Sequence, residues 1–357
     1  MKNTKSKTIA PLRSVSIPEG LADIFLLKNA HGMEATITNY GGILMSLKTA
    51  DRDGVLENIV LGFDDPREYC TDSYFSENPY LGAIVGRNAN VIRGGRFSLD
   101  GSESGLNKNF GDHNLHGGIK GFDKSIWEAI QTASHGTQTL ELFRESPDGE
   151  EGFPGNLHIT VTYELNDHNE FIIRFQASAD RKTVMNFTQH SYFNLKGRSD
   201  ILDHELMIDA ASYVEFDKGL VPTGLIKTVD HTPMDFREPT TIGSRIKADF
   251  DQLIFGEGYD VNYALEETGK WNEHPAATVW EPETARFMEL FTDLPGLQLY
   301  TGNSLNKRVK KGYKAWAGLC LEAQYFPDGP NHAHFKSGIF NAGQPYDHTI
   351  RWKFSVK

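Results

Sequence analysis

"HITVTYELNDHNEFIIRFQASA", residues 158–179, is the stretch that decides the fold class. Every second residue from Ile159 to Leu165 is apolar, and the same period returns from Phe171 to Ala177. Successive side chains of a strand point to opposite faces, so this period indicates two half-buried strands. The polar residues 166–169 lie between them. The stretch therefore predicts an antiparallel hairpin with a polar turn.

Short runs with strand character recur along the whole chain, and Gly, Pro, Asn and Asp separate them. Helical periodicity is scarce, and residues 243–255 are the best candidate for a helix. No linker and no short-period repeat divides the sequence. We therefore expect an all-β protein, with one large antiparallel β-sandwich domain over residues 1–357 and few short helices. About residues 1–15 are expected to form a flexible N-terminal tail.

The composition narrows the class of partner. The 357 residues carry a formal net charge of −12, which argues against binding to nucleic acid or to an anionic membrane surface. The basic run at 307–314 is short, and we interpret it as a solvated loop. Cys70 and Cys320 make no disulfide framework, and no apolar run approaches the ~18 residues of a membrane span. We expect a soluble, cytoplasmic protein with reduced cysteines.

A carboxylate stands in the middle of the strand pattern at residues 316–325, "WAGLCLEAQY". Both faces of this pattern are nearly apolar, as in a strand that is covered on both sides. A carboxylate removed from water without partners is costly, so it normally protonates or recruits a cation. Glu322 is therefore a candidate for chemistry. The alternative is that it forms half of a structural ion pair.

Residues 186–195, "NFTQHSYFNL", predict a strand whose polar and aromatic face includes His190 and Tyr192. Such a face suits a wet cleft with aromatic edges. Taken alone, His190 is compatible with a hydrogen-bonded structural histidine. Together with Glu322 it makes an acid–base pair, because an ionised carboxylate raises the pKa of a nearby imidazole and keeps its own pKa low. We expect the pair to offer one base and one acid near pH 7.

Further polar residues admit two interpretations each. Four more histidines lie at short spacings without an established metal motif, so we expect no metal: His113, His116, His332 and His334. His116 precedes two glycines, which suits a loop close to a ligand or an ordinary tight turn. Asp260 and Gln298 are suitable partners for sugar hydroxyls, or plain turn and strand residues. No phosphate-binding glycine motif and no nucleophile elbow is present.

These segments follow one another in a specific order. From residue 38 to residue 356 the chain reads "TNYGGILMSL", "GRNANVIRGGRFSLDG", "NLHGG", "SPDGEEGFPG", "NFTQHSYFNL", "VPTG", "GYDVNY", "GLQLYTGN", "LCLEAQYFPDGPN" and "YDHTIRWKFSV". In these motifs and their order the chain resembles the aldose 1-epimerase (galactose mutarotase) family. The resemblance implies a large antiparallel β-sandwich with an open sugar cleft, which agrees with the strand patterns.

The resemblance also implies a reaction and its residues. The reaction interconverts the α and β anomers of free aldohexoses such as glucose and galactose, and it needs no cofactor and no metal. Glu322 matches the general base of the family and His190 its general acid. The positions that match sugar-binding residues are Asn90, His116, Tyr192, Asp260 and Gln298. The expected partner is a small aldose, and the expected assembly is a monomer or a homodimer.

Three positions depart from the family pattern. Val91 stands where the family typically has Arg, Val261 where it often has His, and Gln189 where it often has Asn. Positions 91 and 93 share one face of a strand, so we expect Arg93 to bend toward the cleft and partly replace the missing donor. Arg87 shares that parity but has a family position of its own, which favours a structural role.

Other functions stay open at this level. One is a hexose-6-phosphate 1-epimerase on the same fold, which needs an Arg or Lys cluster for the phosphate. Another is a glycoside hydrolase with Asp260 and Glu322 as its two carboxylates. A third is a sugar-binding protein without activity, since a fold does not fix a function.

Overall fold

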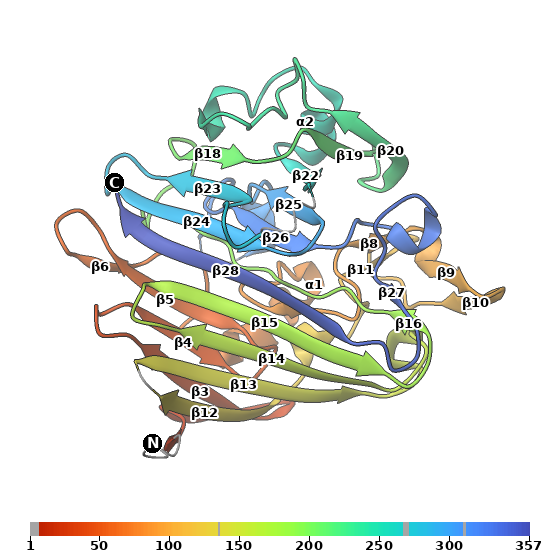
Figure 1. The fold of residues 1–357 in the computed structure, drawn as a ribbon, viewed down its shortest axis with the longest axis horizontal. Coiled ribbons are helices and arrows are strands. Elements are labelled where there is room, and N and C mark those ends of the chain that lie inside the picture. The colour runs from red at the N-terminus through yellow and green to blue at the C-terminus, as the bar shows by residue number, and fades with distance from the viewer. Residues whose placement is uncertain (1–6, 135, 267–270, 310–311) are drawn as a thin grey trace.

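The structure is a computed structural model that describes residues 7–134, 136–266, 271–309 and 312–357. Its largest element is a ten-stranded antiparallel sheet. In spatial order its strands are β1 (Lys7–Ile9), β12 (Glu128–Ser134), β13 (Thr137–Ser146), β14 (Leu157–Leu165), β15 (Glu170–Ala179), β28 (Tyr346–Val356), β24 (Arg286–Thr292), β23 (Ala277–Trp280), β18 (Glu205–Ile208) and β21 (Thr240–Thr241). The long strands β12 to β15 and β28 run side by side across the front of Figure 1.

The predicted hairpin is confirmed as β14 and β15. Leu165 pairs with Phe171 beside the turn, and His158 pairs with Ser178 at the far end. Alternate residues of both strands are buried, as the period of two requires. In the turn, the Asn166 side chain accepts hydrogen bonds from the backbone N–H groups of residues 168 and 170.

Two five-stranded antiparallel sheets complete the main architecture. One consists of β20 (Pro222–Thr228), β19 (Ser212–Phe216), β22 (Asp260–Ala264), β25 (Gly296–Tyr300) and β26 (Cys320–Gln324). The other consists of β2 (Arg13–Ile17), β3 (Gly20–Lys28), β4 (Glu34–Thr38), β5 (Leu44–Ala50) and β6 (Leu56–Asn58). Short two-stranded pairs connect them: β7 (Ile84–Val85) with β17 (Thr188–Gln189), β8 (Val91–Ile92) with β11 (Asn114–Leu115), β9 (Arg96–Leu99) with β10 (Ser102–Gly105), and β16 (Thr183–Val184) with β27 (Ile339–Phe340).

One hydrophobic core joins the three large sheets. It includes Leu27 of β3, Val161 of β14 and Leu321 of β26, all of which are almost fully buried. Burying an aliphatic side chain of this size contributes about 1.5–3 kcal/mol to stability. The core therefore packs β22, β25 and β26 against the ten-stranded sheet, and Figure 1 shows them at the level of β23 and β24.

Helices are short: α1 (Asp72–Glu77), α2 (Asp251–Gly256) and α3 (Leu305–Arg308). The predicted helix over 243–255 is mostly wrong, because only a 3-10 turn at Ile242–Ser244 and α2 form there. The Gln252 side chain bonds both the backbone N–H and the C=O of Phe216, so tertiary contacts fix α2 against β19. None of the helices in the described ranges is long and apolar enough to cross a membrane.

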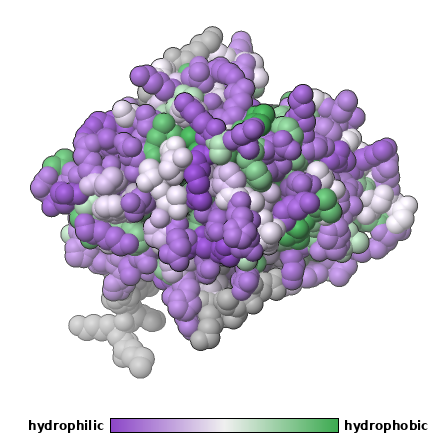
Figure 2. Space-filling view, turned by 90° about the horizontal axis from the view of Figure 1, so that it is seen from above, coloured by the Kyte–Doolittle hydropathy of each residue, from purple (hydrophilic) through white to green (hydrophobic). Residues whose placement is uncertain are grey.

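The expectation of a flexible tail over about 1–15 is wrong for residues 7–15. Residues 7–9 form β1, which pairs with β12, and residue 13 begins β2, which pairs with β3. Backbone pairing with an exposed sheet edge holds these segments although their sequence has little apolar character. Residues 1–6 lie outside the described ranges. Seen from above in Figure 2, the surface is mostly hydrophilic and its hydrophobic residues gather in small patches.

Candidate active site

The two predicted catalytic residues and the five predicted sugar-binding residues all line one cavity of about 300 Å³. They are Asn90, His116, His190, Tyr192, Asp260, Gln298 and Glu322. They come from segments far apart in the chain, so the fold and not the local sequence brings them together. The cavity lies at the lower end of the size range of small-ligand sites.

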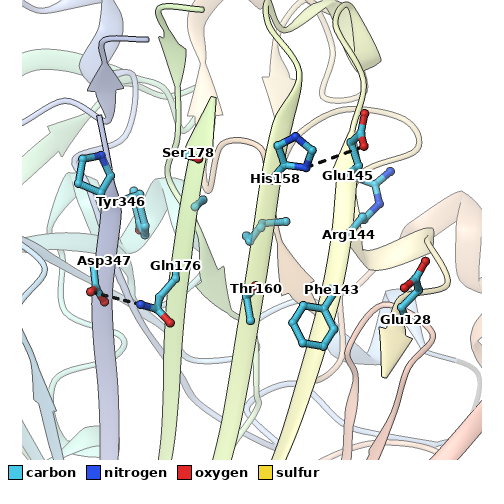
Figure 3. Close-up of a pocket in the computed structure, with 13 residues that line it drawn as sticks. Glu128, Phe143, Arg144, Glu145, His158, Thr160, Gln176, Ser178, Tyr346 and Asp347 are labelled. Carbon is cyan, nitrogen blue, oxygen red and sulfur yellow. Dashed lines mark hydrogen bonds and ion pairs between the residues drawn. The ribbon is translucent and has the colours of Figure 1, made fainter. Parts of the chain in front are cut away.

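A larger hollow of about 520 Å³ lies on the open face of β13, β14, β15 and β28 (Figure 3). His158 Nδ1 and Glu145 Oε2 lie 3.8 Å apart there, and their side chains are 70% and 60% exposed. Water screens such charges, so this ion pair lacks the desolvation that marks a catalytic site. The smaller cavity is therefore the candidate active site.

Three neighbouring strands position the polar floor of the cavity. Glu322 of β26 lies opposite Gln298 of β25. Gln298 Nε2 donates to Asp260 Oδ1 of β22 at 2.6 Å, and its Oε1 accepts from Asn90 Nδ2 at 3.0 Å. This chain of hydrogen bonds fixes which amide atom of Gln298 faces which neighbour. Sheet strands hold such groups more precisely than loops do.

The strand at β26 is shorter than the predicted one, because it begins at Cys320 and not at residue 316. Trp316 has a φ of 61°, so the chain turns there before it enters the sheet. The position of Glu322 agrees with the prediction, since it is 2% exposed in a strand whose five residues are all buried. Its Oε2 has no hydrogen-bond partner among the described residues.

His190 faces Glu322 from a neighbouring segment. Its Nε2 lies 3.6 Å from Glu322 Oε1, and both side chains are nearly fully buried. The rings of Tyr80 and Tyr192 stack on the imidazole, with centroids 5.8 and 5.0 Å away. Cys320 Sγ lies 3.5 Å from the other ring nitrogen, Nδ1. These contacts leave Nε2 as the nitrogen that faces the carboxylate.

The segment around His190 is not the continuous strand that we expected over 186–195. Only Thr188–Gln189 pairs as β17, and further along the segment Phe193 makes isolated bridges to Val60 and Leu319. The hydroxyl of Tyr192 donates to the Pro79 carbonyl at 2.9 Å. Tyr192 therefore presents its ring to the cavity while its hydroxyl is engaged elsewhere.

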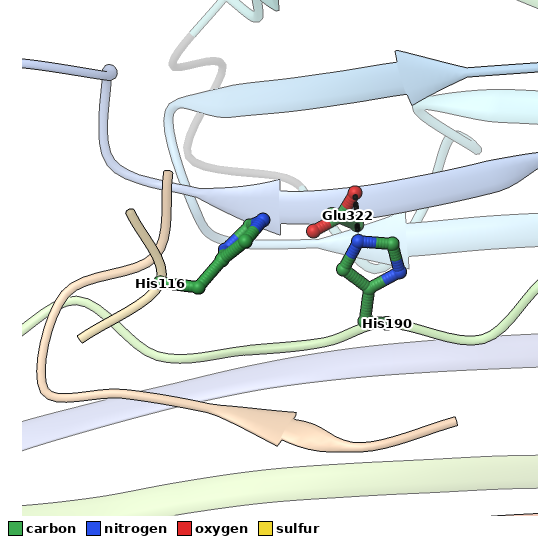
Figure 4. Close-up of side chains that lie close together, drawn as sticks. All are labelled: His116, His190 and Glu322. Atoms are coloured by element: carbon green, nitrogen blue, oxygen red, sulfur yellow. Dashed lines mark ion pairs between the residues drawn. The ribbon is translucent and has the colours of Figure 1, made fainter. Parts of the chain in front are cut away.

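His116 completes the cluster in Figure 4, where it points toward His190 and Glu322. Its Nδ1 accepts the backbone N–H of Asn90 at 3.2 Å, and burial holds its pKa well below the usual range. The neutral ring therefore has its proton on Nε2 and is a donor there. Gly117, with φ of 90°, allows this turn, because a Cβ would lie 2.0 Å from the Gly86 carbonyl oxygen.

Burial shifts the pKa values of the acid–base pair in directions opposite to those that we predicted. It raises the pKa of Glu322 well above its usual range, and the nearby charge of Asp260 acts in the same direction. It also lowers the pKa of His190 to about 3. Removing both groups from water disfavours both charged forms more than their mutual attraction favours them. Both shifts favour the uncharged form of each group.

Of the histidines that we weighed as metal ligands, His113, His332 and His334 make hydrogen bonds outside the cavity. His113 accepts from the backbone N–H of Gly94, while His332 bonds Asp328 and His334 bonds the Gly224 carbonyl. Within the described ranges, a cluster with metal-like spacing is instead His116, His190 and Glu322, whose ligand atoms lie within 4.8 Å of one another. Two imidazoles and one carboxylate are donors that suit zinc or iron.

Comparison with known proteins identifies the family. A family model described as Aldose 1-epimerase matches residues 23–353. The chain belongs to the aldose 1-epimerase family. It is 38% identical to the galactose mutarotase of Bos taurus, over 98% of this chain and 99% of the relative. It is 34% identical to the aldose 1-epimerase of Escherichia coli (strain K12), over 93% of this chain and 94% of the relative.

The fold of this aldose 1-epimerase family member agrees with a solved relative. The crystal structure of galactose 1-epimerase from Lactobacillus acidophilus NCFM matches with a TM-score of 0.84 at 27% identity, over 99% of both chains. The predicted all-β fold of antiparallel sheets with few short helices is therefore confirmed.

The prediction for Arg93 in this member of the aldose 1-epimerase family is wrong. Its Nη2 bonds Asp217 Oδ2 at 2.9 Å and the Pro222 carbonyl at 2.8 Å, and it does not line the cavity. The chain leaves β8 at residue 92 and turns, so positions 91 and 93 do not share a strand face. Arg87 is buried and donates to backbone carbonyls of the loop at 146–155, which is a structural role. Val91 lines the cavity as an apolar residue.

An arginine that we did not predict does line the cavity of this aldose 1-epimerase. Arg308 is the last residue of α3, in the basic run that we interpreted as a solvated loop. That interpretation is wrong for Arg308, although its neighbour Lys307 is exposed and Lys310 and Lys311 lie outside the described ranges. Tyr80 was also missed, because nothing in its local pattern distinguishes it from a core tyrosine.

We expect Asp260→Asn to stabilise this aldose 1-epimerase at pH 8. Burial raises the pKa of Asp260 from 3.8 to about 6, although a hydrogen bond from Gln298 opposes the shift. The folded state thus binds the proton more tightly than the unfolded state, so stability falls as pH rises from about 4 to about 6 and stays at the lower level above that. The variant should gain about 1–3 kcal/mol in urea unfolding at pH 8 and little at pH 4.

The matched control for this prediction is Asp112→Asn, which changes an exposed carboxylate in a loop of the same protein. Its unfolding free energy should change by no more than about 0.5 kcal/mol at either pH. An Asp260→Asn protein that is less stable than the parent at pH 8 would contradict the assigned cost of burying this charge.

Proposed function

We propose that this isomerase interconverts the α and β anomers of free aldohexoses such as glucose and galactose by acid–base ring opening between Glu322 and His190. The observation that supports this most strongly is the 3.6 Å approach of His190 Nε2 to Glu322 Oε1 inside a sugar-sized cavity. A carboxylate and an imidazole at this distance can remove one proton and deliver another within one bound molecule.

Sugar binding creates the charged form of the pair. Glu322 Oε2 has no partner among the described residues, so it is available to a hydroxyl of the substrate. A hydrogen bond to the carboxylate favours its charged form and lowers its pKa, which moves the shared proton to His190. The substrate thus converts a neutral pair into a base and an acid.

The reaction then balances without an external reagent. The Glu322 carboxylate removes the proton from the C1 hydroxyl. The electron pair of the broken O1–H bond then forms the C1=O1 double bond. The C1–O5 bond breaks, and O5 takes the proton of the His190 imidazolium. After rotation about C1–C2, the hydroxyl at C5 attacks the other face of the aldehyde. During ring closure the C5 hydroxyl returns its proton to His190, and Glu322 returns its proton to O1. Both groups thus regain their starting protonation.

The other polar groups of the cavity hold the substrate. Asp260 is an acceptor, and its fixed partner Gln298 keeps it oriented. His116 is a donor through Nε2, because its Nδ1 is already an acceptor for Asn90. Fixed donors and acceptors bind the hydroxyls without reorganising during the reaction, which favours a correctly placed C1.

Polarimetry tests the proposed function directly. Freshly dissolved α-glucose and α-galactose should reach their equilibrium rotation faster with the protein than without it, in proportion to protein concentration. Equal rates for both sugars with and without the protein would contradict the proposed substrates. Assays at several buffer concentrations separate the enzymatic rate from buffer catalysis.

We expect the activity to survive exhaustive dialysis against EDTA, because Glu322 and His190 transfer the protons without a metal. A loss of activity that one added divalent metal restores would contradict this, and it would make ligands of His116, His190 and Glu322. Metal content by mass spectrometry before and after dialysis shows whether the treatment removed an ion.

A further inference from the structure

Arg308 stands in the wall of the cavity with its charge uncompensated. Its guanidinium makes no hydrogen bond and no ion pair with any residue that the structure describes. Lys307, which also lines the cavity, is paired with Glu257 at 2.8 Å and is 61% exposed. A half-buried arginine commonly has a fixed partner, because its five donors lose water on burial.

The helix α3 that carries Arg308 is anchored to the rest of the protein. Leu305 and Val309, on either side of Arg308 in the sequence, are buried. Leu305 N–H donates to the Gly302 carbonyl, and Val309 N–H donates to the Leu305 carbonyl. The Tyr300 and Ser304 hydroxyls are hydrogen-bonded at 2.9 Å just before the helix. Arg308 therefore projects from an anchored turn.

The charge of Arg308 acts across the cavity. Burial is the main influence on the pKa of His116, His190 and Asp260, and the positive charge of Arg308 lowers the pKa of all three. Yet Arg308 forms no ion pair within 4.0 Å of Asp260 or Glu322 in the part of the chain described. The space between the guanidinium and these carboxyl groups is the cavity itself.

We propose that Arg308 determines specificity by donating hydrogen bonds to a hydroxyl of the bound aldose. This inference rests on the proposed function. The planar guanidinium offers donors in a fixed geometry, which suits one hydroxyl or two adjacent ones. Val91 also lines the cavity, and its side chain has no hydrogen-bond donor. Arg308 of α3 supplies a donor to the cavity from a different element.

The test compares Arg308→Ala with the control Arg181→Ala, which removes an exposed arginine that does not line the cavity. Arg308→Ala should raise KM for the preferred aldose roughly 10- to 100-fold and change kcat much less, because a hydrogen bond to a charged donor is lost. Arg181→Ala should leave both constants within about twofold, because Arg181 is 62% exposed and its partner Asp148 is also exposed. Both variants should keep the melting temperature of the parent, since Arg308 has no partner in the protein to lose.

A series of deoxy sugars locates the contact. For the aldose that lacks the hydroxyl bound by Arg308, parent and Arg308→Ala should have the same KM. An unchanged KM in Arg308→Ala for every aldose that the parent converts would overturn the inference and leave the proposed function intact. A rise in the KM of Arg308→Ala that is seen only with a hexuronate or a hexose 6-phosphate would also overturn the inference. A parent that converts no aldose would instead contradict the proposed function.

Discussion

Glu322→Gln should slow anomer interconversion by about 10²-fold or more. The amide has nearly the shape of the carboxylate but cannot take the proton from the C1 hydroxyl. Because burial raises the pKa of Glu322, the parent carries an unfavourable group here, and its replacement should not destabilise the fold. Polarimetry with fresh α-galactose measures the rate, and thermal unfolding checks the fold.

Glu257→Gln is the matched control, since Glu257 lines the same cavity but is 62% exposed and paired with Lys307. Its rate should stay within about twofold of the parent, because an exposed ion pair contributes little. A Glu322→Gln protein that equilibrates α-galactose as fast as the parent would show that Glu322 is not the base.

His190→Asn should also slow anomer interconversion by about 10²-fold or more. Asparagine retains polarity but cannot deliver a proton to the ring oxygen. The loss should fall mainly on kcat, because His190 acts on the ring oxygen while other groups of the cavity bind the hydroxyls. Stopped-flow polarimetry over a range of sugar concentrations separates kcat from KM.

His204→Asn controls for the loss of a buried imidazole. His204 is buried outside the cavity, and its Nε2 accepts the backbone N–H of Leu195. This variant should lower the melting temperature while kcat stays near that of the parent. If both histidine variants lose activity equally, the effect of His190→Asn is structural and the assigned acid is wrong.

The sequence allowed prediction of features that depend on local patterns. A period of two in β14 and β15 reports which side chains are buried, so the hairpin follows from it. Glu322 was found because a charge in an apolar strand contradicts the pattern around it. Asn90 was found only through the resemblance of its motif to a known family, whereas His116 and Gln298 were also singled out by residue type and local sequence.

Other features depend on contacts between distant segments. The direction of the pKa shifts of Glu322 and His190 follows from how deeply the sheets bury the pair, which the spacing of residues does not report. Contacts between distant segments also explain the two arginines. We expected Arg93 at the cavity and Arg308 in a solvated loop, but Arg308 lines the cavity and Arg93 does not. The turn after β8 directs Arg93 to Asp217, and the packing of Leu305 directs α3 to the cavity.

The measurement that tests the central claim most directly is oxygen exchange at C1 during turnover in ¹⁸O-labelled water. Ring opening by Glu322 and His190 breaks the C1–O5 bond and never the C1–O1 bond. Fresh α-glucose is converted, quenched after one half-time and analysed by mass spectrometry, with a protein-free sample of equal age as the blank. The account predicts no ¹⁸O at C1 beyond the blank, whereas one ¹⁸O atom per α-to-β conversion would contradict it and indicate direct displacement of the C1 hydroxyl by water.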